Sequence, residues 1–351
     1  MPASKQPQQD TSRLGSTYAA AGVNLDAAAA VKEKIKKLAA PTLGRQVVSG
    51  PGLFGGVFDP DLRGDSLLVS STDSVGTKIK IASAMGRYDT VGHDIVNHCV
   101  NDVLPAGATP LFFLDYIGIA RVDDGRVPAI VKGLAEACSA AGCALIGGET
   151  ATLPGLYHGD DFDLVGFIVG SVKKRDLLTS ANTRPGDILI GLPSSGLHTN
   201  GYSLVRSIFG TDTDPKPLHK VVPSLGKTLG DALLEPHRSY LTTLKPVLGK
   251  IKGMAHITGG SFYKNLPRSL ADGLAAEIDL RSWTVPPLFR YIQQIGRVDE
   301  AEMWRVYNMG VGMVVIIAPE QADEVKSQMP GSWIAGRVRA ASGNERVILK
   351  K

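Results

Sequence analysis

The spacing of hydrophobic and polar positions predicts most elements of the N-terminal half. Residues 1–16 are polar throughout, which predicts a disordered tail. NLDAAAAVKEKIKKLA, residues 24–39, predicts a helix with a charged side, and Pro41 follows its end. Segments rich in Val, Ile, Leu and Phe predict strands, with helices between them. The strands are expected at 67–72, 111–119, 143–147 and 162–172, and the helices at 90–105 and 127–141.

A shift in composition at KKRDLLTSANTRPGD, residues 173–187, predicts a boundary between two domains. Two domains also suit a length of 351 residues, which exceeds what one typical core holds. We expect an α/β (α+β) fold with an N-terminal domain at 17–172, a linker at 173–186 and a C-terminal domain at 187–351. In the second domain the pattern predicts helices over NGYSLVRSIFG and at 231–248, 261–270 and 286–296, and strands from Asp187 and at 273–280, 312–318 and 333–339.

Composition and charge argue against several classes of protein. Hydrophobic residues make up 43% of the chain, and its 38 basic and 34 acidic residues form no basic block. The longest apolar run, MVVIIA at 313–318, is too short to span a bilayer, and MPASKQPQQDTSRLG lacks the apolar centre of a signal peptide. We therefore expect a cytoplasmic protein that binds neither nucleic acid nor membrane. The three cysteines, Cys99, Cys138 and Cys143, lack metal-ligand spacing, so we expect free thiols.

Glycine is over-represented, with 40 of the 351 residues. These glycines gather at PGLFGG, LIGGET and HITGG, where they favour tight turns and close approach of the backbone to a ligand. The stretch around the first motif, residues 51–65, predicts a mobile loop.

The stretch VSSTDSVGTKIKIA, residues 69–82, has polar chemistry between apolar flanks. Asp73, Ser74, Gly76, Thr77 and Lys78 fall in a predicted turn at the end of a strand. An acid, two hydroxyl groups, a glycine and a base are thus brought together. This turn is the first candidate site.

The second candidate site is a polar side of the next predicted helix. In TVGHDIVNHCVNDVLPAGA, helical spacing places Asp94, His98, Asn101 and Asp102 on one side, with apolar residues opposite. A solvated helix face is the alternative, but such faces are normally built from Lys, Glu and Arg, and this one has none. Short Asp and Asn side chains favour metal or phosphate coordination.

A third acid, Glu149, follows the predicted strand in LIGGETATLPG, although a capping role is equally open. Asp73, Asp102 and Glu149 would repel one another unless a hard cation such as Mg²⁺ joined them. Mg²⁺ in turn suggests a triphosphate, with Lys78 and Lys36 as sources of positive charge. The chain has no GxxxxGK[ST] loop, so an ATP site must be of another type.

Two segments of the C-terminal half, LPSSGLHTNGYSLVR and HITGGSFYKNLPR, each join a short strand to a helix. Their Gly, Ser and Thr residues leave backbone N–H groups that can hold phosphate. Asn200 is open to a second interpretation as a helix cap, and His198 as an ordinary loop histidine.

Six segments in order resemble successive motifs of the phosphoribosylformylglycinamidine cyclo-ligase (aminoimidazole ribonucleotide synthetase) family. They are TDSVGTK, HDIVNHCVND, PLFFLDYIG, GGETATLPGLYHG, SSGLHTNGYSLVR and HITGGSFYKNLPR, and the resemblance runs from residue 18 to residue 317. It implies Mg²⁺ ligands at Asp73, Asp102 and Glu149, and catalytic roles for Lys36, Asp73 and His198. It also implies ATP contacts at Gly55, Gly56, Gly76, Thr77, Lys78, Asp94 and Asn101, and substrate contacts at Asn200, Gly259 and Gly260.

The same resemblance implies ATP-dependent ring closure of formylglycinamidine ribonucleotide to aminoimidazole ribonucleotide, with release of ADP and phosphate. It implies a homodimer in which the N-terminal sheets of two subunits form a barrel. Selenophosphate synthetase, thiamine-phosphate kinase and a non-catalytic nucleotide-binding paralogue are the alternatives. The chain departs from the family pattern at Ser74, Thr152 and Ser261, and the two serines stand where glycine is usual. Serine takes a positive φ reluctantly, so the sequence leaves the local backbone geometry at these two positions open.

Overall fold

The structure, a computed structural model, describes residues 16–23, 25–49, 53–121 and 125–351. The predicted disordered tail therefore lies almost wholly outside the described residues. The α-helices are α1 (Leu25–Ala39), α2 (Lys78–Met85), α3 (Asp89–Val103), α4 (Arg126–Ala141), α5 (Tyr202–Phe209), α6 (Leu229–Leu233), α7 (Leu241–Leu244), α8 (Ser261–Asn265), α9 (Pro287–Gly296), α10 (Glu300–Val306) and α11 (Ala322–Ser327). The strands are β1 (Val47–Ser49), β2 (Gly56–Phe58), β3 (Ser66–Ser74), β4 (Thr109–Ile119), β5 (Ala144–Thr152), β6 (Phe162–Lys173), β7 (Ile188–Pro193), β8 (Val221–Val222), β9 (Lys227–Thr228), β10 (Ile251–His256), β11 (Leu274–Asp279), β12 (Val311–Ile317), β13 (Trp333–Ala340) and β14 (Val347–Lys350).

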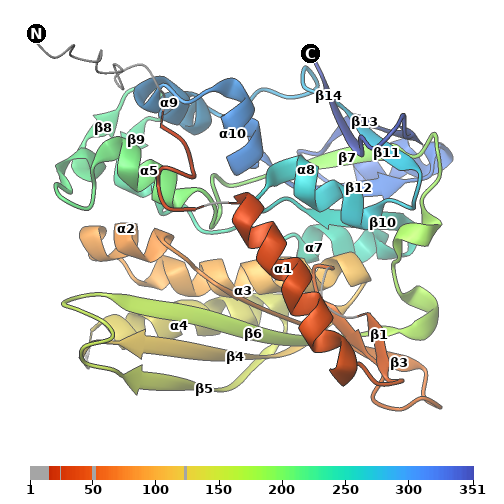
Figure 1. The fold of residues 1–351 in the computed structure, drawn as a ribbon, viewed down its shortest axis with the longest axis horizontal. Coiled ribbons are helices and arrows are strands. Elements are labelled where there is room, and N and C mark those ends of the chain that lie inside the picture. Colours follow the sequence, from red (N-terminus) through yellow and green to blue (C-terminus); the bar gives the residue numbers. More distant parts are fainter. Residues whose placement is uncertain (1–15, 24, 50–52, 122–124) are drawn as a thin grey trace, which may run out of the picture.

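The N-terminal half forms a six-stranded sheet in the order β1-β2-β3-β6-β4-β5. Its neighbouring strands are antiparallel except for β4 and β5, which α4 connects in parallel. Figure 1 shows α2 and α3 between this sheet, at the bottom, and the C-terminal half above. Helix α3 is therefore an internal layer, and twelve of its fifteen residues are buried.

A pair of glycines lets α3 and α4 cross closely. A Cβ atom at Gly92 would overlap the backbone of Ile130, and one at Gly133 would overlap the backbone of Asp89. Close packing of this kind fixes where the polar residues of α3 point.

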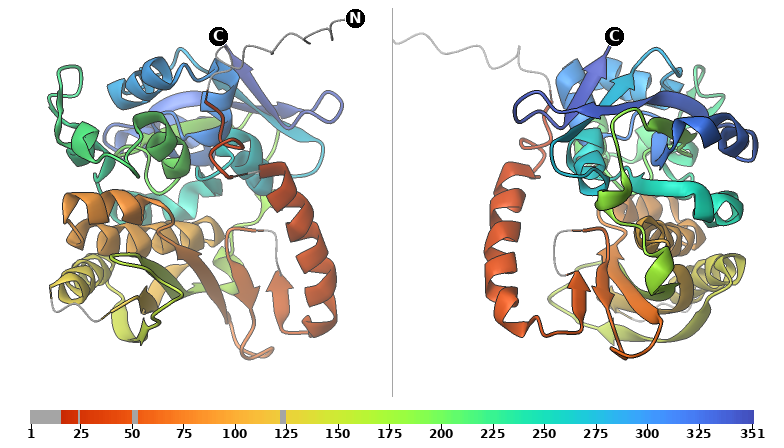
Figure 2. Two further views of the ribbon diagram at one scale, coloured as in Figure 1. Left: turned by 60° about the vertical axis from the view of Figure 1, so that its left-hand side comes forward. Right: turned by 90° about the vertical axis from the view of Figure 1, so that its right-hand side faces the viewer.

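The C-terminal half is built on a second sheet in the order β10-β12-β7-β13-β11-β14. All seven residues of β12 are buried, as its uninterrupted apolar sequence predicts. Figure 2 shows α1 standing along one flank of the molecule, from the lower edge of the C-terminal half down beside the N-terminal sheet. Among the described residues, no helix combines the length and apolar character that crossing a membrane requires.

Four local predictions are wrong, and strand pairing explains two of them. Strand β3 runs on to Ser74, because pairing with β6 extends through Asp73, so Asp73 lies in a strand and not in a turn. Strand β5 runs on to Thr152 because it pairs with β4, so Glu149 lies within the strand. The loop at 51–65 contains β2, and the helix at 231–248 is two short helices with an extended segment between them.

Candidate active site

A cleft of about 780 Å³ opens between the two halves, with α1 along one side. Strand β3 and helix α3 contribute one wall, and loops of the C-terminal half contribute the other. The polar side chains lining it include Lys36, Asp73, His98, Asp102, Thr199 and Asn200.

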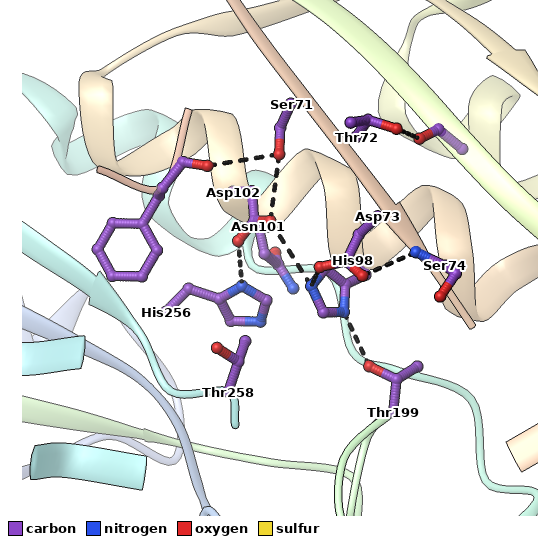
Figure 3. A network of polar contacts seen from close by, with 12 residues as sticks. Ser71, Thr72, Asp73, Ser74, His98, Asn101, Asp102, Thr199, His256 and Thr258 are labelled. Atoms are coloured by element: carbon purple, nitrogen blue, oxygen red, sulfur yellow. Dashed lines mark hydrogen bonds and ion pairs between the residues drawn. The ribbon is translucent and has the colours of Figure 1, made fainter. Parts of the chain in front are cut away.

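His98 lies between two carboxylates in this cleft, as Figure 3 shows. Its Nε2 atom is 3.1 Å from Oδ2 of Asp73 and 3.6 Å from Oδ2 of Asp102. Its Nδ1 atom is 2.8 Å from the hydroxyl oxygen of Thr199. Asp73 comes from the end of β3, whereas His98 and Asp102 are one turn apart on α3. The crossing of strand and helix thus assembles the group.

Electrostatics make His98 a cation at neutral pH. Burial would lower the pKa of His98, but the charges of Asp73 and Asp102 outweigh it and raise the pKa to about 9. Partial burial would likewise raise the pKa of Asp73, but the charge and hydrogen bond of His98 hold it below its usual range. The imidazolium therefore neutralises part of the charge of two neighbouring acids.

Asp102 also joins the two halves of the molecule. Its Oδ1 atom is 2.8 Å from Nδ1 of His256, at the end of β10, and its Oδ2 atom accepts a hydrogen bond from Ser71 at 3.3 Å. His256 is fully buried, while Asp102 keeps 10% of its side chain exposed toward solvent. Both oxygens of Asp102 thus have partners within the protein, and only a small part of the side chain is exposed.

Lys78, the first residue of α2, and Asp94, in the second turn of α3, form a buried ion pair. Their charged groups are 2.8 Å apart, and neither side chain is exposed. Burial lowers the pKa of Lys78 and raises that of Asp94, and in each case the partner's charge opposes the shift. Lys78 also donates to the carbonyl of Glu235, and Asp94 accepts from the amide of His237. The pair therefore ties the N-terminal half to the segment after α6.

Asn101, two helical turns after Asp94 on α3, adds to the contacts between the two halves. Its amide donates to the carbonyl of Arg238 at 2.8 Å and accepts from the amide of Tyr240 at 3.0 Å. The polar side of α3 is consequently a surface between domains, and the solvated alternative does not hold.

Comparison with known proteins supplies the family. The family model described as AIR synthase related protein, N-terminal domain, matches residues 54–172, and the corresponding C-terminal domain matches residues 184–348. The chain is 48% identical to the phosphoribosylformylglycinamidine cyclo-ligase of Desulfitobacterium hafniense, covering 94% of this chain and 98% of that one. It is 45% identical to the Caldicellulosiruptor bescii cyclo-ligase, covering 95% and 99%. The chain belongs to the phosphoribosylformylglycinamidine cyclo-ligase family.

Solved structures with lower sequence identity show the same two-domain α/β architecture. A complex of AaThiL with AMPPCP and TMP superposes with a TM-score of 0.63 at 15% identity, over 93% of this chain and 95% of that one. The cyclo-ligase family and this solved neighbour therefore share a fold.

The structure brings some of the predicted residues of the cyclo-ligase site to the cleft. Lys36, Asp73, Asp102, Asn200 and Gly259 line it. Lys36 is paired with Glu33 at 2.7 Å, on the face of α1 that meets the cleft.

Other predicted residues lie beside the cleft or behind it. Gly55 packs against the backbone of β3 next to Gly56, and Gly76 precedes Thr77, whose hydroxyl is 3.0 Å from that of Ser203. Gly260 has φ of 87° at the start of α8. Lys78, Asp94, Asn101 and His198 are at most 1% exposed, so a ligand reaches none of their side chains in this structure. Contact between any of these residues and a ligand stays a prediction.

Glu149 is not brought to the other two acids within one chain. A row of paired residues runs across the sheet from β3 to β5. Asp73 in β3 pairs with Gly166 in β6, Gly166 pairs with Asp115 in β4, and Asp115 pairs with Gly148 in β5. Three strand spacings separate β3 from β5, or about 14 Å. Glu149 is exposed on that outer strand.

Four functional candidates were missed from the sequence. Lys264 and Arg268 line the cleft, and the guanidinium of Arg268 lies 4.7 Å from the centre of the Phe54 ring. Both follow the predicted HITGG turn at helical spacing, which was a usable signal. His237 and His256 lie beneath the cleft, and only the fold brings them together.

Proposed function

We propose that this protein catalyses ATP-dependent ring closure of formylglycinamidine ribonucleotide to 5-aminoimidazole ribonucleotide, releasing ADP and phosphate. Membership of the cyclo-ligase family over nearly the whole chain carries this conclusion. The cleft supports it, because it combines acids for a metal–triphosphate complex with bases for phosphate groups.

The chemistry explains why ATP is needed. An amide oxygen is a poor leaving group, so transfer of the γ-phosphoryl group to the formyl oxygen converts it into a phosphate ester. The neighbouring substrate nitrogen then bonds to the formyl carbon, the carbon–oxygen bond breaks, and phosphate leaves. Catalysis of this kind depends on positioning and charge neutralisation, which a cleft closed on several sides provides.

Asp73 and Asp102 have the chemistry that Mg²⁺ prefers. Both carboxylates line the cleft, and His98 lies within 3.6 Å of each of them. Mg²⁺ bound there would neutralise charge on the ATP phosphates. Lys36, which lines the cleft from α1, is placed to balance phosphate charge from the opposite side.

The substrate side of the cleft is formed by the C-terminal half. Asn200 and Gly259 are close together, since a Cβ atom at Gly259 would lie 2.9 Å from Oδ1 of Asn200. Lys264 and Arg268 add two cations on the same wall. We assign the ribose phosphate of the substrate to this wall, because phosphate is its most strongly charged group.

A homodimer accounts for the position of Glu149. Strand β5 is an outer strand with exposed backbone groups, and Ile146 is 58% exposed on it. Pairing two N-terminal sheets into a barrel would cover this edge. We infer that Glu149 joins the metal site of the partner subunit and not that of its own chain.

The reaction is tested by supplying alternative phosphoryl acceptors. Purified protein with Mg²⁺ and ATP should release phosphate with formylglycinamidine ribonucleotide, and release little with thiamine monophosphate or selenide. Chromatography should identify aminoimidazole ribonucleotide as the product. Turnover with thiamine monophosphate in place of the amidine substrate would contradict the proposal, and nucleotide binding without any turnover would favour a non-catalytic paralogue.

A further inference from the structure

The lysine and arginine side chains that line the cleft differ in the partners they already have. Lys36 is paired with Glu33 at 2.7 Å, and Lys264 donates to the carbonyl of Leu25 at 3.0 Å. Arg268 also lines the cleft, but it has neither an ion pair nor a hydrogen bond within the part of the chain that the structure describes. Of these three cations, Arg268 is therefore the one whose N–H donors are available to a ligand.

Arg268 lies at the border between the cleft and a separate cavity. This cavity has a volume of about 170 Å³ and is lined largely by apolar residues, among them Val57, Leu177 and Met254. Burial lowers the pKa of Arg268, and the charge of Asp102 opposes this shift. A guanidinium has five N–H donors, and an apolar cavity offers few acceptors for them. An anion on the cleft side is therefore the partner that this side chain lacks.

The ring of Phe54 holds the guanidinium at this border. The centre of the ring lies 4.7 Å from the guanidinium carbon of Arg268, which is within the range of a cation–π contact. The backbone around Phe54 is itself fixed on β3. The hydroxyl of Ser71 donates to the Phe54 carbonyl at 3.4 Å, and a Cβ atom at Gly55 would lie 3.0 Å from the carbonyl oxygen of Ser70. A ring anchored in the N-terminal half thus positions a cation of the C-terminal half.

We propose that Arg268, positioned by the ring of Phe54, is the residue that binds the phosphate group of the ribonucleotide substrate. This inference rests on the proposed function, and it assigns to one residue the phosphate that the function places on the C-terminal wall. A planar guanidinium donates two parallel N–H bonds to one phosphate, which an ammonium does not do. Contact with Phe54 restricts the guanidinium before the ligand arrives, so that less conformational entropy is lost on binding.

The triphosphate of ATP is the other source of phosphate in this cleft. The residues proposed for it, Asp73, Asp102 and Lys36, belong to β3, α3 and α1. Arg268 belongs to the segment Leu266–Ser269 of the C-terminal half, which contributes the facing wall. Changes at Arg268 or at its aromatic neighbour should therefore weaken binding of the ribonucleotide substrate and spare binding of ATP.

Steady-state kinetics of the full-length protein with both substrates varied test this assignment. Arg268→Gln should raise the KM for formylglycinamidine ribonucleotide about 100-fold, and Phe54→Leu about tenfold, while the KM for ATP stays within about twofold of the parent value. Phe54→Tyr keeps an aromatic face and should restore the KM for the ribonucleotide. The matched control is Phe58→Leu at the end of β2, which makes the same change outside the lining of the cleft and should leave both KM values unchanged.

Calorimetry with ribose 5-phosphate in the absence of ATP tests the same residue apart from the reaction. The parent protein should bind ribose 5-phosphate much more tightly than ribose, and Arg268→Gln should remove the difference. If Arg268→Gln does not fold, Arg268→Lys, which keeps the charge and loses the planar fork, provides the comparison and should bind ribose 5-phosphate about tenfold more weakly than the parent.

Three results would overturn the assignment: equal binding of the two sugars by the parent protein, a rise in KM confined to ATP, or equal effects of Phe54→Leu and Phe58→Leu. Failure of the proposed function looks different. In that case the parent protein would bind ribose 5-phosphate through Arg268 and still form no aminoimidazole ribonucleotide.

Discussion

At the scale of single residues, His98 has the largest effect on the charge of the cleft, because it lies between two carboxylates. Its place on the polar side of α3 is visible in the sequence, but its position between Asp73 and Asp102 depends on how β3 crosses the helix. From the sequence, the acidic side chains are expected to repel one another. In the folded chain, the His98 imidazolium lies between Asp73 and Asp102 and offsets this repulsion.

This cation predicts a pH dependence of the metal-free protein. The folded pKa of His98, about 9, lies above its unfolded value of 6.5. Its contribution to the free energy of unfolding is therefore complete below pH 6.5 and is lost as the pH rises through 9. We expect His98→Gln to cost up to about 3 kcal/mol at pH 6.5 and much less at pH 9.5. Urea unfolding in chelator across this range measures it, and an equal cost of His98→Gln at pH 6.5 and pH 9.5 would contradict it.

Ser261 has a positive φ at a position where the family usually has glycine. It adopts φ of 52°, and among the described residues its buried hydroxyl has no hydrogen-bond partner. Ser74, in contrast, is the last residue of β3 and pairs with β6, so it has an extended backbone conformation that serine adopts easily.

Replacing Ser261 by glycine should therefore stabilise the protein. A left-handed conformation costs a non-glycine residue roughly 1–3 kcal/mol, and the added flexibility of glycine in the unfolded chain offsets part of it. We expect Ser261→Gly to raise the free energy of unfolding by about 1 kcal/mol. The control Ser207→Gly, at an exposed helical position, should lower it by about 0.5 kcal/mol. A lower melting temperature for Ser261→Gly would count against strain at this site.

At the scale of elements, the long periodic segments are predictable and the short ones are not. Helices α1, α3, α4 and α9 and strands β4, β6 and β12 lie close to their predicted places, because each carries its own hydrophobic pattern. Strand β5 was underestimated because GGET has low strand propensity, and pairing with β4 overrides it. Helix α2 was missed because its eight residues read as an apolar strand flank.

Strand β5 also gives the prediction for assembly. Ile146 should be covered in a dimer that joins two sheets at this edge, so Ile146→Lys would bury a charge there. Light scattering should give about twice 37.1 kDa for the parent and near 37.1 kDa for the variant. Ile295→Lys, at a similarly exposed position on α9, should leave the mass unchanged. A parent protein that is monomeric and active would show that Glu149 does not act across a dimer.

At the scale of the whole molecule, buried polar contacts hold the two halves together. The sequence shows that Lys78, Asp94 and Asn101 are unusual, and predicts contacts with a ligand. The structure shows them bonded to residues 235–240, which no local pattern connects to α3. Long-range pairing of this kind is the part of the site that sequence periodicity does not contain.

Breaking this connection should be far more costly than breaking a surface pair. Asp94→Asn leaves the Lys78 charge buried without its counter-charge, which costs about 3–5 kcal/mol. Asp65→Asn removes an exposed partner of Lys173 at 2.8 Å, and because water screens this pair the free energy of unfolding should change far less. Denaturant unfolding of both variants measures the contrast, and equal costs would mean that the buried pair does not join the domains.

The coupling between ATP cleavage and ring closure tests the central claim most directly. Because the phosphoryl acceptor is a substrate oxygen and the cleft must exclude water, ATP and Mg²⁺ alone should give almost no phosphate. Adding formylglycinamidine ribonucleotide should give one phosphate for each aminoimidazole ribonucleotide formed. Phosphate and product measured in the same quenched samples provide this ratio. Brisk phosphate release without the substrate, or release that is not matched by product, would contradict the cyclo-ligase account.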